Sequence, residues 1–86
     1  SRAFMAMLEW WLARMIRFAA LGQQPPDIVD GDGELSQRLA ARRSLDQWIE
    51  VWEKITRLAT RADSVYLDRK QVLLNVFSML EKAARA

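Results

Sequence analysis

Residues 44–86 read SLDQWIEVWEKITRLATRADSVYLDRKQVLLNVFSMLEKAARA, and this stretch decides the fold. Its first half repeats apolar residues every three or four positions, which is the spacing of one face of an α-helix: Leu45, Trp48, Ile49, Trp52, Ile55, Ala59 and Ala62. Charged residues occupy most of the positions in between. The pattern predicts an amphipathic helix over 44–63 that packs through one face.

A start signal supports this helix. Gln47 follows Ser44 at the spacing of a capping box, in which each side chain accepts a hydrogen bond from the other residue's backbone N–H. We therefore expect the helix to begin at Ser44. Tryptophans at helical spacing are more often packed than left free to stack on a ligand, so Trp48 and Trp52 are predicted to be core residues.

The second half of the stretch predicts another helix, over 68–84. Asp68 can accept a hydrogen bond from the N–H of Gln71 and suits the positive end of the helix dipole. The inward stripe is expected to contain Val72, Leu73, Val76, Phe77, Leu80, Ala83 and Ala84, with Phe77 and Leu80 in the core. Residues 63–67 are too few for more than an αα-hairpin, so the two helices should be antiparallel.

Residues 2–21 predict a helix that is apolar around most of its circumference, because only Glu9, Arg14 and Arg17 are charged in the run from 3 to 21. These charges argue against a membrane span or a secretory signal. A helix of this kind is buried on more than one side, and the rest of the chain is short. We expect part of its surface to contact another segment or subunit, with these interface candidates: Met7, Trp10, Trp11 and Arg14. The alternative is that the tryptophans cover the edge of a loose bundle.

A loop is predicted over 22–33, starting at Gly22, which suits a left-handed helix end. Its acidic residues do not fit a calcium loop, because an EF-hand counted from Asp30 needs Gly at Leu35 and Glu at Ala41. We interpret them as solvated turn residues. A short helix should follow over 34–42, with Leu35 and Leu39 facing inward.

The composition excludes several functions. The chain has no Cys and no His, and its 13 basic and 11 acidic residues give a net charge of +2 without a basic block. No phosphate-binding glycine loop and no nucleophile with a suitable base is present, so we expect no catalysis, no metal and no cofactor. The densest basic group is Arg38, Arg42 and Arg43. We expect it to complement the end of the short helix rather than to bind phosphate, although nucleic-acid binding together with Arg69 and Lys70 stays open as a weaker alternative.

The order of motifs from 45 to 85 resembles the C-terminal end of the delta-prime subunit of bacterial DNA polymerase III, in its alphaproteobacterial form. The resemblance is carried by Trp48-x-x-x-Trp52 and, after a further helical stretch, by Leu67, Asp68, Arg69, Lys70 and Gln71. The first predicted helix, with Leu8, Trp11 and Leu12 ahead of an arginine, is similar to a helix of the same domain. The resemblance covers nearly all 86 residues, but the loop at 22–33 matches nothing specific.

The resemblance implies a collar domain, which holds the clamp-loader complex together for DNA replication without an ATP site of its own. The implied partners are the other clamp-loader subunits, delta and gamma/tau, in the cytoplasm, with no direct contact to nucleic acid and no membrane. Because the chain starts without Met, we expect it to be a C-terminal piece of a longer subunit; a homodimer of the isolated piece stays open. The rival hypothesis is a stand-alone adaptor or regulator that binds a partner helix.

Taken together, these patterns predict an all-α fold for residues 1–86. We expect one small antiparallel helical bundle of three long helices and one short helix.

Overall fold

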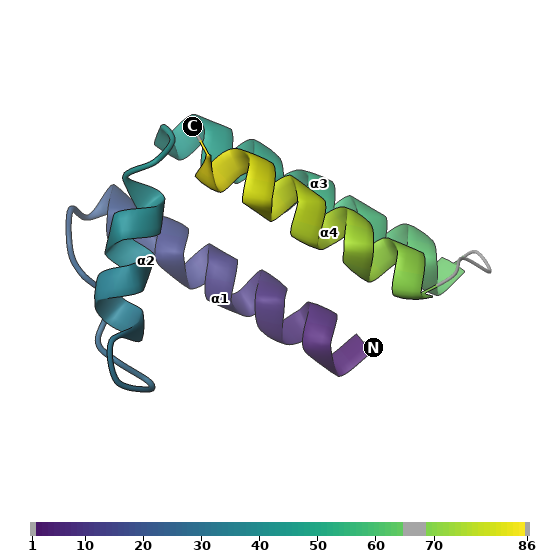
Figure 1. Ribbon diagram of the computed structural model, residues 1–86, viewed down its shortest axis with the longest axis horizontal. Helices are drawn as coiled ribbons and strands as arrows, with labels where there is room; N and C mark the ends of the chain where they lie inside the picture. Colours follow the sequence, from purple (N-terminus) through teal and green to yellow (C-terminus); the bar gives the residue numbers. More distant parts are fainter. Residues whose placement is uncertain (1, 65–68, 86) are drawn as a thin grey trace.

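The computed structural model describes residues 2–64 and 69–85, and all the regular structure in them is helical (Figure 1). The four helices are α1 (Arg2–Ala20), α2 (Asp32–Ala40), α3 (Leu45–Ser64) and α4 (Arg69–Ala84). This confirms the predicted all-α class with three long helices and one short one. The long helices begin and end within one residue of the predicted bounds. The predicted start of α4 at residue 68, and most of the predicted hairpin connection, lie outside the described residues.

The short helix is shifted from its predicted position. We expected it over 34–42, but α2 covers Asp32–Ala40 and so begins and ends two residues earlier. The shift has a physical reason at each end of α2. Hydrogen bonds from the preceding loop fix its start, and the arginines after its end bind α4. Both sets of contacts are described below.

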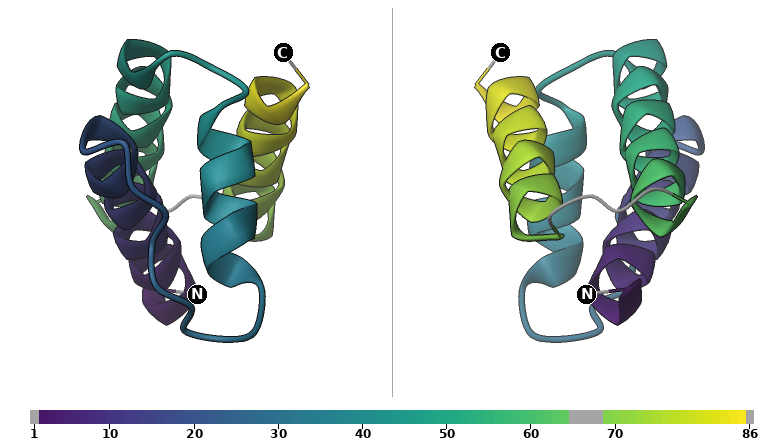
Figure 2. Two further views of the ribbon diagram at one scale, coloured as in Figure 1. Left: turned by 90° about the vertical axis from the view of Figure 1, so that its left-hand side faces the viewer. Right: turned by 90° about the vertical axis from the view of Figure 1, so that its right-hand side faces the viewer.

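Helix α3 is central to the arrangement, because it packs against both α1 and α4. It lies antiparallel to each of them, while α2 crosses one end of the bundle and packs against α1 (Figure 1). Viewed from that end, α2 stands between α1 and α4, and α3 lies behind α1 (Figure 2). The bundle is therefore three long helices with a short transverse helix at one end.

The core forms where the three long helices meet. Its buried apolar residues are Met5, Leu12, Met15, Trp48, Ile55, Val72, Val76 and Ala83. Trp48 is the largest of them, and its indole Nε1 donates a hydrogen bond to the carbonyl oxygen of Ala40 at 3.1 Å, which ties the start of α3 to the end of α2. Trp52 and Leu80 are half-buried and pack against this core, so they lie at its edge.

The prediction that Phe77 is a core residue is wrong, because half of its surface is exposed. Val72, Val76 and Ala83 form the buried stripe of α4, and Phe77 lies one position beyond Val76, about 100° further around the helix. Its ring instead contacts the ring of Phe4 on α1, with centroids 5.9 Å apart and planes at 50°. Phe77 thus lies on the side of α4 that faces α1.

Two predicted helix ends have the expected geometry. Gly22 has φ of +67°, and the N–H groups of Gly22 and Gln23 donate to the carbonyls of Ala19 and Phe18, which is the Schellman arrangement at a helix end. At the start of α3, Ser44 and Gln47 form the reciprocal capping box, with N–H to side-chain oxygen distances of 3.0 and 3.2 Å. Local sequence therefore fixes both ends.

The start of α2 is held by a carboxylate from earlier in the loop. Asp27 accepts hydrogen bonds from the N–H of Gly33 at 2.8 Å and from the N–H of Gly31 at 3.1 Å, and Asp32 accepts one from the N–H of Ile28. Asp32, which we expected to be a solvated turn residue, is therefore bound to a backbone group, and so is Asp27. The resulting register leaves Gly33 and Ser36 buried, so the prediction that Leu35 faces inward is also wrong; Leu35 is exposed.

The Gly33→Ala substitution is expected to lower the free energy of unfolding by about 1–3 kcal/mol through overpacking. A Cβ at this position would overlap the carbonyl oxygen of Pro25 and lie 2.7 Å from Asp27 Oδ1. Urea unfolding followed by circular dichroism measures the loss. Gly22→Ala is the matched control. A Cβ at Gly22 meets nothing within 4 Å, so any loss of stability in this variant comes only from placing alanine at a positive φ. A Gly33→Ala variant as stable as the wild type would show that α2 does not approach the loop this closely.

Asp27→Asn is expected to lower the melting temperature at neutral pH and to flatten its acid dependence. The N–H groups of Gly33 and then Gly31 hold the pKa of Asp27 below its ordinary value. Stability from this carboxylate is thus fully present above the ordinary pKa of aspartate, about 4, and is lost as the pH falls through the lower folded-state pKa. Thermal melts from neutral to strongly acid pH test this. Asp30→Asn in the same loop is the control, and identical curves for both variants would contradict the assignment.

Candidate functional site

The four interface candidates on α1 have different surroundings. Met7 and Trp10 are exposed, at 58% and 51% of their surface. Trp11 is half-buried and packs against the core. Arg14 is buried, with 8% exposed. Met7 and Trp10 are therefore the candidates most available for contact with another molecule, whereas Arg14, which we predicted as an interface residue, is buried inside the protein.

Arg14 is a structural residue that attaches the loop to α1. Its Nη2 donates a hydrogen bond to the carbonyl oxygen of Pro26 at 2.5 Å. The guanidinium also lies over the rings of Trp10 and Phe18, 5.8 and 5.4 Å from their centroids, within range of cation–π attraction. These two residues are one turn before and one turn after Arg14. The loop thus covers the second half of this side of α1 and leaves the first half uncovered.

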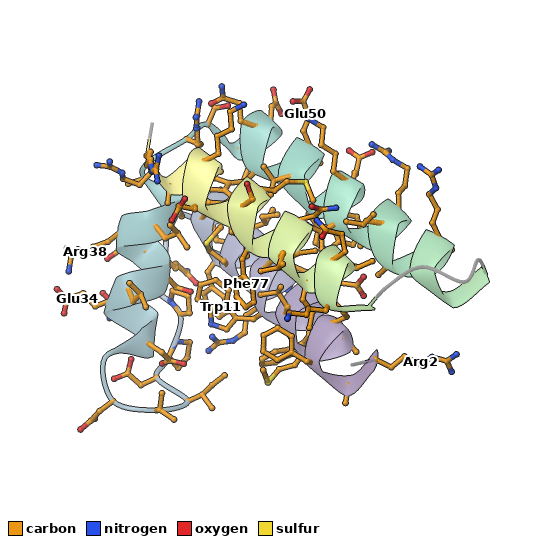
Figure 3. All side chains as sticks on the ribbon, turned by 45° about the vertical axis from the view of Figure 1, so that its right-hand side comes forward. Arg2, Trp11, Glu34, Arg38, Glu50 and Phe77 are labelled. Atoms are coloured by element: carbon orange, nitrogen blue, oxygen red, sulfur yellow. The ribbon has the colours of Figure 1, made fainter. Side chains whose placement is uncertain are left out.

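Helix α4 adds apolar surface next to the uncovered part of α1. Leu74 and Phe77 are about half-exposed and lie one turn apart, and Phe77 joins α1 through its ring contact with Phe4. Figure 3 shows Phe77 and Trp11 where α4 passes α1. We call the combined surface the α1–α4 face and define it by five residues: Phe4, Met7, Trp10, Leu74 and Phe77.

The arginines after α2 do not form an open anion site. Arg42 Nε donates to the carbonyl oxygen of Ala84 at 2.7 Å, and Arg43 donates to those of Ala83 and Lys82 at 3.0 and 3.3 Å. They therefore satisfy the last carbonyls of α4, where a positive charge also suits the helix dipole, and not the end of α2 as we predicted. Arg38 is exposed on α2.

The residues of the family motif lie at the start of α4. Leu67 and Asp68 are outside the described residues. Arg69 is the first residue of α4, and Lys70 is exposed in its first turn. The motif therefore adds no described side chain to the α1–α4 face.

Residues 2–64 and 69–85 contain neither a cluster of metal ligands nor a membrane-spanning helix. No group of three or more Asp, Glu, His or Cys side chains is placed there to hold a metal ion. None of the helices in this part of the chain has the length and apolar character needed to cross a membrane. Exposed apolar side chains at helical spacing are suited to contact with another protein surface, so the α1–α4 face is the candidate site.

Comparison with known proteins gives no relative: no family model, no curated protein and no solved structure matches this chain.

Proposed function

We propose that this chain is an oligomerisation domain whose α1–α4 face is covered by another subunit, as the resemblance to the delta-prime collar implies. The observation that carries the proposal is the exposure of two aromatic residues, Trp10 on α1 and Phe77 on α4, each with an exposed apolar residue three positions earlier on its own helix, Met7 and Leu74. Aromatic residues and methionine are enriched at the centres of protein interfaces.

The energetics support a covered face. Full burial of a large apolar side chain contributes about 1.5–3 kcal/mol, so covering the exposed half of each contributes on the order of 1 kcal/mol. The four exposed side chains on two joined helices together supply several kcal/mol of association free energy before the costs of association. A domain of this size also buries a smaller fraction of its surface than a larger one does, and so benefits from a partner.

The proposed partners are the other clamp-loader subunits, delta and gamma/tau. In such a complex the domain would contribute contact surface, while ATP hydrolysis and clamp opening would belong to other parts. Nucleic-acid binding is a weaker proposal, because Arg42 and Arg43 already donate to α4. In this proposed role the protein would act in the cytoplasm.

A second candidate is an adaptor that binds one amphipathic helix. It is favoured by the spacing of the exposed residues, since Met7 and Trp10 on α1, and Leu74 and Phe77 on α4, are each three positions apart. A partner helix bound between these two rows could contact them with apolar residues at its own i, i+3 and i+4 positions.

The test is the mass of the protein in solution, measured by light scattering after size exclusion, alone and mixed with the C-terminal domains of the other clamp-loader subunits. Stable co-assembly is the expected result. A folded monomer that does not bind these domains would contradict the collar proposal and favour the adaptor. If the protein forms a homodimer by itself but assembles with the other domains when they are mixed, the result would agree with the collar proposal.

A further inference from the structure

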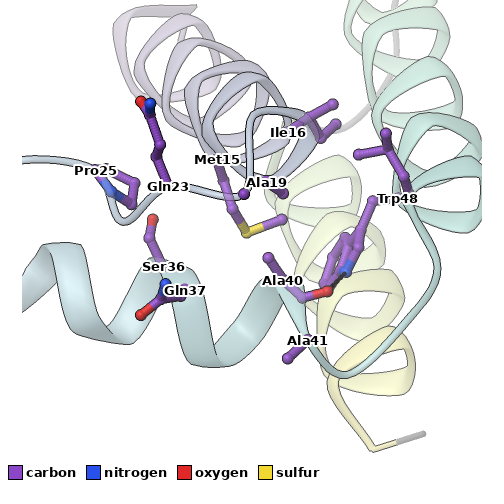
Figure 4. A pocket seen from close by; sticks show the side chains of 12 residues that line it. Met15, Ile16, Ala19, Gln23, Pro25, Ser36, Gln37, Ala40, Ala41 and Trp48 are labelled. Carbon is purple, nitrogen blue, oxygen red and sulfur yellow. Dashed lines mark hydrogen bonds between the residues drawn. The ribbon is translucent and has the colours of Figure 1, made fainter.

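A pocket of about 300 Å³ lies where the second half of α1, the following loop, α2 and the start of α3 meet (Figure 4). Its buried wall contains Met15, Pro25, Ser36 and Trp48, while Gln23 and Gln37 line its exposed part. The pocket therefore opens to solvent and reaches down to the core. It is separate from the α1–α4 face, none of whose defining residues lines it.

Ser36 is the unusual residue of this pocket. It is 1% exposed, and its Oγ has no hydrogen-bond partner. A buried hydroxyl without a partner carries a desolvation cost, and such groups are uncommon in folded proteins. In Figure 4 the Ser36 side chain projects from α2 towards the segment that contains Gln23 and Pro25.

The lining decides which ligands fit. The side chains around the pocket are apolar or neutral, with no acidic or basic residue among them, so an ionic ligand would lose its hydration without gaining a counter-charge. An apolar cavity of about 150 Å³ is enough to bind benzene, and this pocket is about twice as large. A ligand of one or two rings therefore matches its size.

We propose that the pocket binds a neutral aromatic compound of one or two rings with a single hydrogen-bonding group, and that this group becomes the partner of Ser36 Oγ. The hydroxyl is closed to solvent in this structure. Met15 and Gln23 line the same space with flexible side chains, and their rotation would open the path to Ser36. Ring contact with the buried wall then supplies affinity, and the hydroxyl selects ligands that have a polar group.

The proposal is tested with two probes of similar size, phenol and benzene, titrated into the whole chain and followed by NMR. Saturable shifts are expected at the Met15 methyl and at the indole N–H of Trp48 for both probes. Ser36→Ala should weaken phenol binding at least threefold while leaving benzene binding within twofold of wild type. Ala40→Phe, which fills the pocket, should abolish both.

Two results would overturn the proposal. One is that neither phenol nor benzene gives saturable shifts up to its solubility limit. The other is an equal effect of Ser36→Ala on phenol and benzene, which would mean that the hydroxyl does not contact the ligand. If Ala40→Phe does not fold, the Ser36→Ala comparison decides alone. Assembly through the α1–α4 face is a separate measurement, so neither result depends on the proposed function.

Discussion

Replacement of Trp48 by alanine is expected to lower the free energy of unfolding by about 3–5 kcal/mol, the usual cost of removing a large aromatic side chain from a core. Trp48 is 1% exposed, and its removal also leaves the Ala40 carbonyl without the indole donor. A domain of this length has a total stability of about 4–13 kcal/mol at 0.05–0.15 kcal/mol per residue. The variant should therefore lose a large share of its stability and unfold at a much lower urea concentration than the wild type.

Urea unfolding followed by circular dichroism measures this effect, with Trp10→Ala as the matched control. Trp10 is the same residue type, but half of it is exposed and its ring mainly faces the Arg14 guanidinium, so we expect a loss of about 1 kcal/mol or less. Equal losses for the two variants would contradict the packing described for α3. A Trp48→Ala variant that melts like the wild type would contradict it more strongly.

The double variant Trp10→Ser/Phe77→Ser is expected to keep the fold but to weaken assembly at least 30-fold. Two central aromatic residues of an interface commonly supply 2 kcal/mol or more of binding free energy, and 2 kcal/mol corresponds to about a factor of 30. The fold should be affected much less, because both side chains are half-exposed and the internal interactions that the variant removes are the ring pair of Phe4 and Phe77 and the contact of Trp10 with the Arg14 guanidinium. Affinity for the partner domains is measured by isothermal titration calorimetry, and folding by circular dichroism.

The control for this variant is Leu21→Ser/Ile28→Ser. These two residues are as exposed as the replaced aromatics, at 67% and 58%, but they lie outside the α1–α4 face. The control should assemble as tightly as the wild type. If it loses assembly while the Trp10→Ser/Phe77→Ser variant retains it, the interface lies on the loop side of the molecule.

The long helices were predictable because their signals are local. The apolar spacing of α3, the Ser44–Gln47 capping box and the position of Gly22 all act within a few residues, and the structure has each of them. The short helix was harder to place, because its start depends on Asp27, which lies outside the helix and binds N–H groups four and six residues later.

Phe77 shows why an apolar stripe alone does not define the core. The apolar band of α4 is wider than the surface that α3 covers, and it contains Val72, Leu73, Val76 and Phe77. The spacing of these residues does not say which edge of the band stays exposed. The outcome depends on how α1 meets α4, because α1 contacts Phe77 through the ring of Phe4 without burying it. In α4 the buried residues of this band are the two valines, and the aromatic residue is at the rim beside Phe4.

The candidate site was only partly predictable, because arginines that the sequence offered as interface or anion-binding residues instead bind backbone carbonyls in distant parts of the chain. Arg14 binds a carbonyl 12 residues away, and Arg43 binds carbonyls 39 and 40 residues away. No spacing rule reveals such pairs. Met7 and Trp10, two of the four predicted interface candidates, are exposed, as expected of an over-apolar helix in a short chain that leaves part of its surface uncovered. Leu74 and the pocket around Ser36 were missed, because both depend on how the helices cross.

The most direct test of the α1–α4 face is hydroxyl-radical footprinting of the protein alone and in complex with the partner clamp-loader domains. Met7, Trp10 and Phe77 react readily with hydroxyl radicals when exposed, so their oxidation rates report whether the face is covered. We predict that all three rates fall several-fold in the complex, while the rates of Leu21 and Ile28 stay unchanged. Unchanged rates at Met7, Trp10 and Phe77 in a complex of verified mass would contradict the account, because the interface would then lie elsewhere.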